Sequence, residues 1–217
     1  MENVTTAEHV AHAEHGHEEH ELSFWQAYIF SLDHKVIGIQ YAITALLFLL
    51  FGFSLMAVMR WQLAFPGAPI PIIGNFLGQA NAPGGIMLPE FYNQLGAMHG
   101  TIMVFFVLTT APRGGFGNYM LPIQIGAADM AFPILNMLSF WFTFLALLVL
   151  MAAFFVTGGP PISGWTGYPP LSALGEIAGP GLGMGQNLWI VSIAIFCIAA
   201  LLGALNFIAT TIDLRAK

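Results

Sequence analysis

Charged side chains are scarce in this chain. Of its 217 residues, 7% are Asp, Glu, Lys or Arg, whereas 57% are hydrophobic, and the mean hydropathy is +0.77. Soluble domains carry about 25% charged residues, and the few charges present here are not enough to cover a water-facing surface. The shortage excludes an ordinary soluble globule and favours a membrane protein. Because the apolar runs are continuous and do not alternate with polar residues, a helical bundle is favoured over a β-barrel.

Cysteine and basic residues are also few. The single cysteine, Cys197, excludes a disulfide within the chain and a metal site built from several thiolates. Lys and Arg together number five and form no basic patch, so nucleic acid is not an expected partner. The formal net charge of −6 comes largely from the first 21 residues.

Residues 1–23 are acidic and rich in histidine, and they lack the basic start and apolar centre of a signal peptide. We expect a solvated cytoplasmic tail. His9, His12 and His15 recur every three residues, and such a tract can also bind zinc, nickel or copper weakly. The sequence leaves the solvated tail and the metal-binding tail as alternatives.

The remaining chain, residues 24–217, is predicted to be an all-α, polytopic membrane bundle. It contains four apolar runs, each close to the ~20 residues that cross a bilayer. These predicted transmembrane helices lie near residues 36–59, 93–111, 131–156 and 188–212. The link between the second and third runs holds Arg113, whereas the two long Gly- and Pro-rich loops are almost free of cations. The positive-inside rule then places the N-terminus and this link in the cytoplasm, and the two loops outside.

One histidine interrupts the second run, in the stretch LGAMHGTIMVFFVL. An ionisable group inside a membrane span is costly and points to function. His99 is predicted either to hydrogen-bond a neighbouring helix or to donate its electron pair to a haem iron. Gly96 and Gly100 flank it, and their missing side chains would let a flat macrocycle or another helix approach.

At this point the sequence resembles subunit I of the haem-copper terminal oxidases, of the cytochrome c oxidase (aa3-like) type. The stretches that carry the resemblance occur in family order across residues 31–217: SLDHKVIGIQY, MHGTIMVFF, GGFGNYMLPIQIGAADMAFPILN, GWTGYPPL and LLGALNFIATTI. The family has a fold of twelve spans, so the resemblance implies that this chain corresponds to the first third of such a subunit. We therefore expect the chain alone to be incomplete and inactive.

The resemblance assigns haem-binding roles to residues near the outer side. It implies that His99 is one axial ligand of the low-spin haem iron, while the second ligand lies on a later helix. Arg60 would hydrogen-bond the formyl group of a haem a and raise its potential; as a plain alternative, it reaches the interface with its charged end. Tyr92 and Trp165 match residues that hold haem propionates, or else are ordinary interfacial aromatics.

The resemblance also implies a proton-uptake channel. In the family, the aspartate that matches Asp129 opens the channel; alternatively Asp129 caps or begins the next helix. Residues that match lining positions of this channel are Asn118, Asn136, Asn206, Tyr41 and Ser139. Asparagines can order a file of water, although interhelical hydrogen bonding is the plain alternative. Members of the family usually have serines at the positions of Ala199 and Ala200. The middle of the implied file of water therefore departs from the family pattern.

The wider function that the resemblance implies is the reduction of O2 to water with proton pumping, in the bacterial cytoplasmic (inner) membrane. The cofactors would be a low-spin haem a, with haem b as the alternative, and a high-spin haem with CuB on later helices. CuA would sit on a partner subunit if the donor is cytochrome c. The partners would be subunits II and III, cytochrome c or quinol as donor, membrane lipids, and a respiratory supercomplex. The leading rivals are a di-haem cytochrome b, which needs four paired histidines, and a transporter with a metal-sensing tail.

Overall fold

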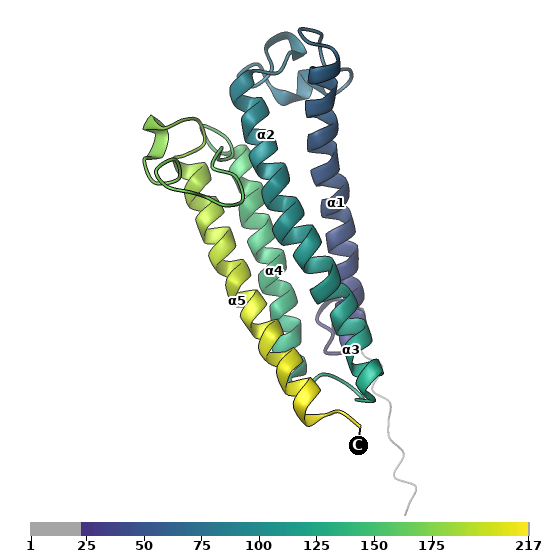
Figure 1. The fold of residues 1–217 in the computed structure, drawn as a ribbon. Helices are drawn as coiled ribbons and strands as arrows, with labels where there is room; N and C mark the ends of the chain where they lie inside the picture. Colours follow the sequence, from purple (N-terminus) through teal and green to yellow (C-terminus); the bar gives the residue numbers. More distant parts are fainter. Residues whose placement is uncertain (1–22, 217) are drawn as a thin grey trace, which may run out of the picture. The chain divides into compact units, whose positions relative to one another are not determined.

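The computed structural model describes residues 23–216, and these fall into two parts that divide between Ser31 and Leu32. The predicted tail, including its histidines, lies outside the described residues up to position 22. The first part contains one short π-helix, Trp25–Ile29. The second part contains every long helix of the described chain, and its arrangement is shown in Figure 1.

The first long helix, α1 (His34–Ala64), begins where Asp33 supplies a cap. The Asp33 carboxylate accepts hydrogen bonds from the backbone N–H groups of Lys35 (2.6 Å) and Val36 (3.4 Å). Such a cap satisfies N–H groups that have no partner within the helix. At about 1.5 Å per residue the helix is roughly 46 Å long, which exceeds the ~30 Å hydrocarbon core of a bilayer.

The second span is one continuous helical stretch, Pro89–Ile125. It consists of α2 (Pro89–Thr101), the π-helical segment η4 (Ile102–Gly117) and α3 (Asn118–Ile125). The wider winding of η4 is visible in its side chains: the Thr109 and Thr110 hydroxyls donate to carbonyls five residues back. The sequence-based end at position 111 was therefore wrong, and Arg113 lies in the helix and not in a link.

Close packing explains why the Pro- and Gly-rich stretch after position 111 does not end the helix. The two glycines that follow Arg113 are buried against α1. A Cβ atom on Gly114 would lie 2.5 Å from Cδ1 of Tyr41, and one on Gly115 would lie 3.3 Å from Cα of Ala42. Small residues that let two helices approach are a common means of packing in membranes. These glycines thus hold the second span against α1 instead of terminating it.

Replacing Gly114 with alanine should destabilise the protein. The Tyr41 ring that its Cβ would meet is only 2% exposed and cannot swing into solvent, and overpacking of this kind costs about 1–3 kcal/mol. Gly203→Ala is the matched control, because its nearest atoms, in Ser139, lie at 3.8 and 4.0 Å. Thermal unfolding in detergent should show a lower midpoint for Gly114→Ala alone. Equal midpoints for the two variants would show that the packing is looser than described.

The last two spans are α4 (Pro133–Ala152), which continues into the short turn η5 (Ala153–Phe155), and α5 (Met184–Asp213). They pack along each other, while α1 packs mainly against η4 (Figure 1). Four helices in all are long and apolar enough to cross a membrane, and residues 23–216 contain no strand. The predicted all-α membrane bundle with four spans is confirmed.

The loops at residues 65–88 and 156–183 lie at the same end of the second part, called here the loop end (Figure 1). They contain only short 3₁₀ turns: η2 (Gly74–Leu77) and η3 (Pro83–Gly85) in the first, and η6 (Gly175–Ile177) in the second. The opposite end, called the Asp129 end, holds the start of α1, the link at residues 126–132 and the end of α5. There the Ala216 N–H donates to the Ile125 carbonyl at 2.8 Å.

Candidate functional site

His99 lies on α2 and is tied to α1 by its ring. The Nδ1 atom is 2.8 Å from the backbone carbonyl oxygen of Gly52, and the side chain is half-buried. A carbonyl can only accept, so Nδ1 carries the proton and donates it, which leaves the lone pair on Nε2. No group among residues 23–216 forms a hydrogen bond with Nε2. A histidine whose second nitrogen is fixed in this way has the arrangement typical of a metal ligand.

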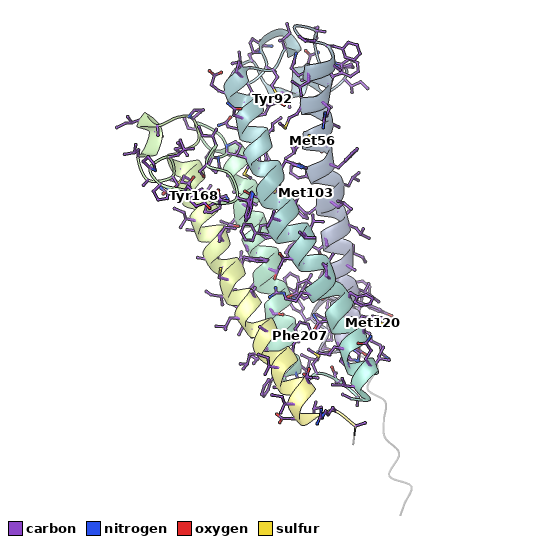
Figure 2. The ribbon with its side chains drawn as sticks, in the orientation of Figure 1. Met56, Tyr92, Met103, Met120, Tyr168 and Phe207 are labelled. Atoms are coloured by element: carbon purple, nitrogen blue, oxygen red, sulfur yellow. The ribbon has the colours of Figure 1, made fainter. Side chains whose placement is uncertain are left out.

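Methionine side chains fill the space beside glycines on both helices that the His99 ring joins. A Cβ on Gly52 would lie 2.9 Å from Sδ of Met103, and one on Gly96 would lie 3.2 Å from Cε of Met59. In the view of Figure 2, the labelled Met56 and Met103 lie between the ribbons of α1 and the second span. Methionine side chains adapt their shape readily to an irregular neighbour.

The donor set near His99 fits a haem better than a bare metal ion. Within residues 23–216, no three His, Cys, Asp or Glu side chains gather in a way that could hold a metal. A lone imidazole serves as an axial ligand when a porphyrin supplies the other four nitrogens. The fixed tautomer, the apolar walls and the absence of competing ligands in the described chain are therefore consistent with one axial position.

The other predicted haem-binding residues lie toward the loop end. Trp165 is 49% exposed, and its Cδ1 would lie 3.4 Å from a Cβ on Gly100, directly beside His99 in the sequence. Its ring centroid is 6.5 Å from that of Phe105 on the same span. Tyr92 is half-buried near the start of α2, and Arg60 is exposed near the end of α1. The structure thus places Trp165 close to the backbone around His99, whereas no polar contact joins Arg60 to the described residues.

A buried polar chain connects α1 with α4. The Tyr41 hydroxyl lies 2.9 Å from Oγ of Ser139, which donates to the Asn136 carbonyl at 2.8 Å. Because the single Ser139 hydrogen is engaged in that bond, Tyr41 is the donor to Ser139. Thr143 lies 3.5 Å from the same Tyr41 hydroxyl. All four side chains are nearly inaccessible to solvent, so three of the predicted lining residues are brought together.

Several buried amide atoms along this region have no hydrogen-bond partner among residues 23–216. They are Nδ2 and Oδ1 of Asn136, Oδ1 of Asn118 and Nδ2 of Asn206. Buried polar groups are nearly always hydrogen-bonded, and ordered water is the usual partner when the protein supplies none. Ordered water is one partner that would satisfy these atoms of the three asparagines.

Asp129 lies in the link between α3 and α4 and is half-buried. Its Oδ1 accepts a hydrogen bond from the neighbouring Met130 N–H at 2.6 Å. The N-cap position of α4 belongs to Phe132, so the alternative in which Asp129 caps that helix is wrong. The Phe132 N–H donates instead to Oδ1 of Asn206 at 2.8 Å, and this bond joins the link after Asp129 to the amides inside the bundle.

Two polar residues that sequence reasoning missed belong to this region. Thr143 follows Ser139 by one helical turn, a spacing that signals a shared face. Thr210 accepts a hydrogen bond from the Ala131 N–H at 2.9 Å and donates to the Asn206 carbonyl at 2.7 Å. Its spacing of four residues from Asn206 was an available signal. Gly52, whose carbonyl orients His99, gives no signal in the sequence.

A sequence profile of the family described as "Cytochrome C and Quinol oxidase polypeptide I" matches residues 36–217. The chain belongs to this family. The resemblance to oxidase subunit I that the sequence motifs predicted is confirmed, and the match is to an N-terminal portion of such a subunit.

Among the relatives of this oxidase polypeptide, the "Alternative cytochrome c oxidase subunit 1" of Bradyrhizobium diazoefficiens is 43% identical over 198 residues, which is 91% of this chain and 31% of that protein. The "Cytochrome c oxidase subunit 1" of Synechocystis sp. is 40% identical over 200 residues, 91% of this chain and 32% of that protein. A third relative, the "Cytochrome c oxidase subunit 1" of Thermostichus vulcanus, is 40% identical over 187 residues, which is 86% of this chain and 30% of that protein. The chain thus spans about a third of the length of these relatives.

Proposed function

We propose that this chain forms part of the catalytic subunit of a respiratory haem-copper oxidase that reduces O2 to water and pumps protons. The observation that carries the proposal is the hydrogen bond from His99 Nδ1 to the Gly52 carbonyl. It holds Nε2 ready to coordinate iron inside an apolar part of the bundle. Family membership and the four apolar helices support the same conclusion. Optical spectra of the assembled oxidase with His99 replaced test it.

His99 would hold a low-spin haem a, with haem b as the alternative, and the bound haem would supply reversible one-electron transfer. The role of the chain is to fix the imidazole tautomer and to keep water from the iron with Met59 and Met103. Trp165 and Tyr92, at the loop end, would bind the propionates, and Arg60 the formyl group. The high-spin haem and CuB would be held by the rest of the subunit, and CuA by a partner subunit if cytochrome c is the donor.

The polar chain would carry protons inward from the Asp129 end. Asp129 collects protons at the surface, and waters bound to the unpartnered amide atoms of Asn118, Asn136 and Asn206 relay them. Tyr41 and Ser139 continue the hydrogen-bonded chain toward the centre of the bundle. In this proposal the Asp129 end faces the cytoplasm, and the membrane is the bacterial inner membrane. Subunits II and III, a cytochrome c or quinol donor and a respiratory supercomplex are the expected partners.

Asn136→Leu should separate stability from proton transfer. Neither side-chain atom of Asn136 has a protein partner, so an apolar side chain of similar size removes a desolvation cost without breaking a protein hydrogen bond. The variant should unfold at the same or a higher temperature, yet take up protons at least tenfold more slowly because a relay water is lost. Stopped-flow proton uptake and thermal unfolding measure the two effects. A less stable variant with normal uptake would contradict the water relay.

A further inference from the structure

Arg113 is a charged residue within the second span, where the sequence predicted a position in a cytoplasmic link. It lies in η4, is half-buried, and its Nη1 donates to the Ala200 carbonyl of α5 at 3.1 Å. Its Cζ atom is 5.9 Å from the centre of the Phe196 ring. Since Ala200 is thirteen residues before the end of α5 at Asp213, the guanidinium sits about 20 Å along that helix from the Asp129 end.

The charge of Arg113 has no carboxylate partner among residues 23–216, since its contacts there are the carbonyl and the ring face. Charged side chains within membrane spans face the bundle interior and mark functional sites. A carbonyl and an aromatic face can hold a guanidinium but do not neutralise it. Arg113 is therefore a fixed positive charge inside the bundle.

This charge lies beside the polar chain. The next residue, Gly114, packs against the Tyr41 ring so tightly that a Cβ would clash with it. On α5, the Ala200 carbonyl that binds the guanidinium lies about one helical turn before Gly203, where an added Cβ would be 3.8 Å from Oγ of Ser139. Tyr41 is in turn hydrogen-bonded to Ser139. On the α5 side, Ala199 and Ala200 have no hydroxyl group. The Arg113 guanidinium of η4 binds the backbone of α5 at this level.

We propose that Arg113 is an electrostatic barrier that limits passive proton flow along the path through Asn136, Ser139 and Tyr41. A proton on a water of this path is repelled by the guanidinium, as positive groups repel protons and cations in selective pores. The barrier suppresses backflow driven by the membrane potential. This inference rests on the proposed proton path. Arg113 acts on protons in that path through its charge, and it does not contact the proposed haem ligand His99.

The test measures passive proton leak in liposomes that contain the assembled oxidase without electron donor. A potassium diffusion potential set by valinomycin drives the leak, and an internal pH-sensitive dye reports it. Arg113→Gln should raise the leak on the order of tenfold, the size of effect that one unit charge has on another about 10 Å away at an effective dielectric constant near 20. Arg113→Lys keeps the charge and should leak like the parent protein.

Each outcome bears on the proposal. A parent-like leak in Arg113→Gln overturns it, and so does an equal rise in both variants, because that pattern reports loosened packing and not lost charge. The double variant Arg113→Gln with Asn136→Leu should return the leak to the parent level. An undiminished leak there places the flow on another route and also overturns the proposal. The proposed oxidase function is tested separately, by turnover and uptake in Asp129→Asn, and its failure would appear there.

Discussion

His99→Ala removes the low-spin haem band from the optical spectrum of the assembled oxidase. Nδ1 of His99 is bonded to the Gly52 carbonyl and Nε2 is left to bind iron, and alanine has no atom to replace it. Loss of an axial ligand leaves the iron five-coordinate, so the low-spin band should disappear or the haem should fail to bind. Reduced-minus-oxidised spectra and haem extraction of the purified complex measure both.

His34→Ala is the matched control for this experiment. His34 is also buried, and its Nδ1 also bonds a backbone carbonyl on a neighbouring span, that of Asn118 at 2.9 Å. It lies at the Asp129 end, at the first residue of α1, away from the methionine-lined region. Its loss should lower stability but keep the haem band. An unaltered band in His99→Ala would refute the ligand assignment.

Asp129→Asn should slow proton uptake and oxygen turnover by roughly ten- to a hundredfold, within the range that a positioned proton-transfer group contributes. The amide keeps the size of the side chain and the oxygen that accepts the Met130 N–H, so the link should keep its conformation. What is lost is the negative charge and the ability to take up a proton at neutral pH. Oxygen consumption and proton uptake by the reconstituted oxidase report the change.

Asp213→Asn serves as its comparison, because Asp213 is an exposed carboxylate at the same end of the bundle, on the last residue of α5. It has the same charge, but its carboxylate forms no hydrogen bond with residues 126–132 in the described chain. Its replacement should leave uptake nearly normal. Equal slowing in both variants would mean that surface charge in general, and not the Asp129 position, governs uptake.

The four spans followed from hydrophobic length alone, because a lipid-embedded helix must be about 20 residues long and apolar. The end of the second span did not follow from hydrophobic length. Pro112 and the glycines after it are ordinary stop signals, but here Gly114 and Gly115 meet Tyr41 and an α1 backbone some seventy residues earlier. A role that depends on such a distant partner cannot be read from local composition.

The candidate site was predicted unevenly for the same reason. His99 stood out because it is isolated in an apolar run, whereas the Gly52 carbonyl that orients it is 47 residues away in the chain. The asparagines were predicted as channel-lining residues from the family motifs. Only the structure shows that four of their six side-chain amide atoms have no hydrogen-bond partner in the described chain. Arg113 was placed at the surface because a cation near a span end usually marks topology. The unforeseen continuation of the helix put it inside.

The central claim is that His99 coordinates iron through Nε2, and a density map of the assembled oxidase tests it most directly. Such a map should show a porphyrin beside the His99 ring, with its iron about 2 Å from Nε2 as in other metal–imidazole bonds, and Nδ1 still donating to the Gly52 carbonyl. A map in which Nε2 meets lipid or a protein acceptor, with no porphyrin beside the ring, would contradict it.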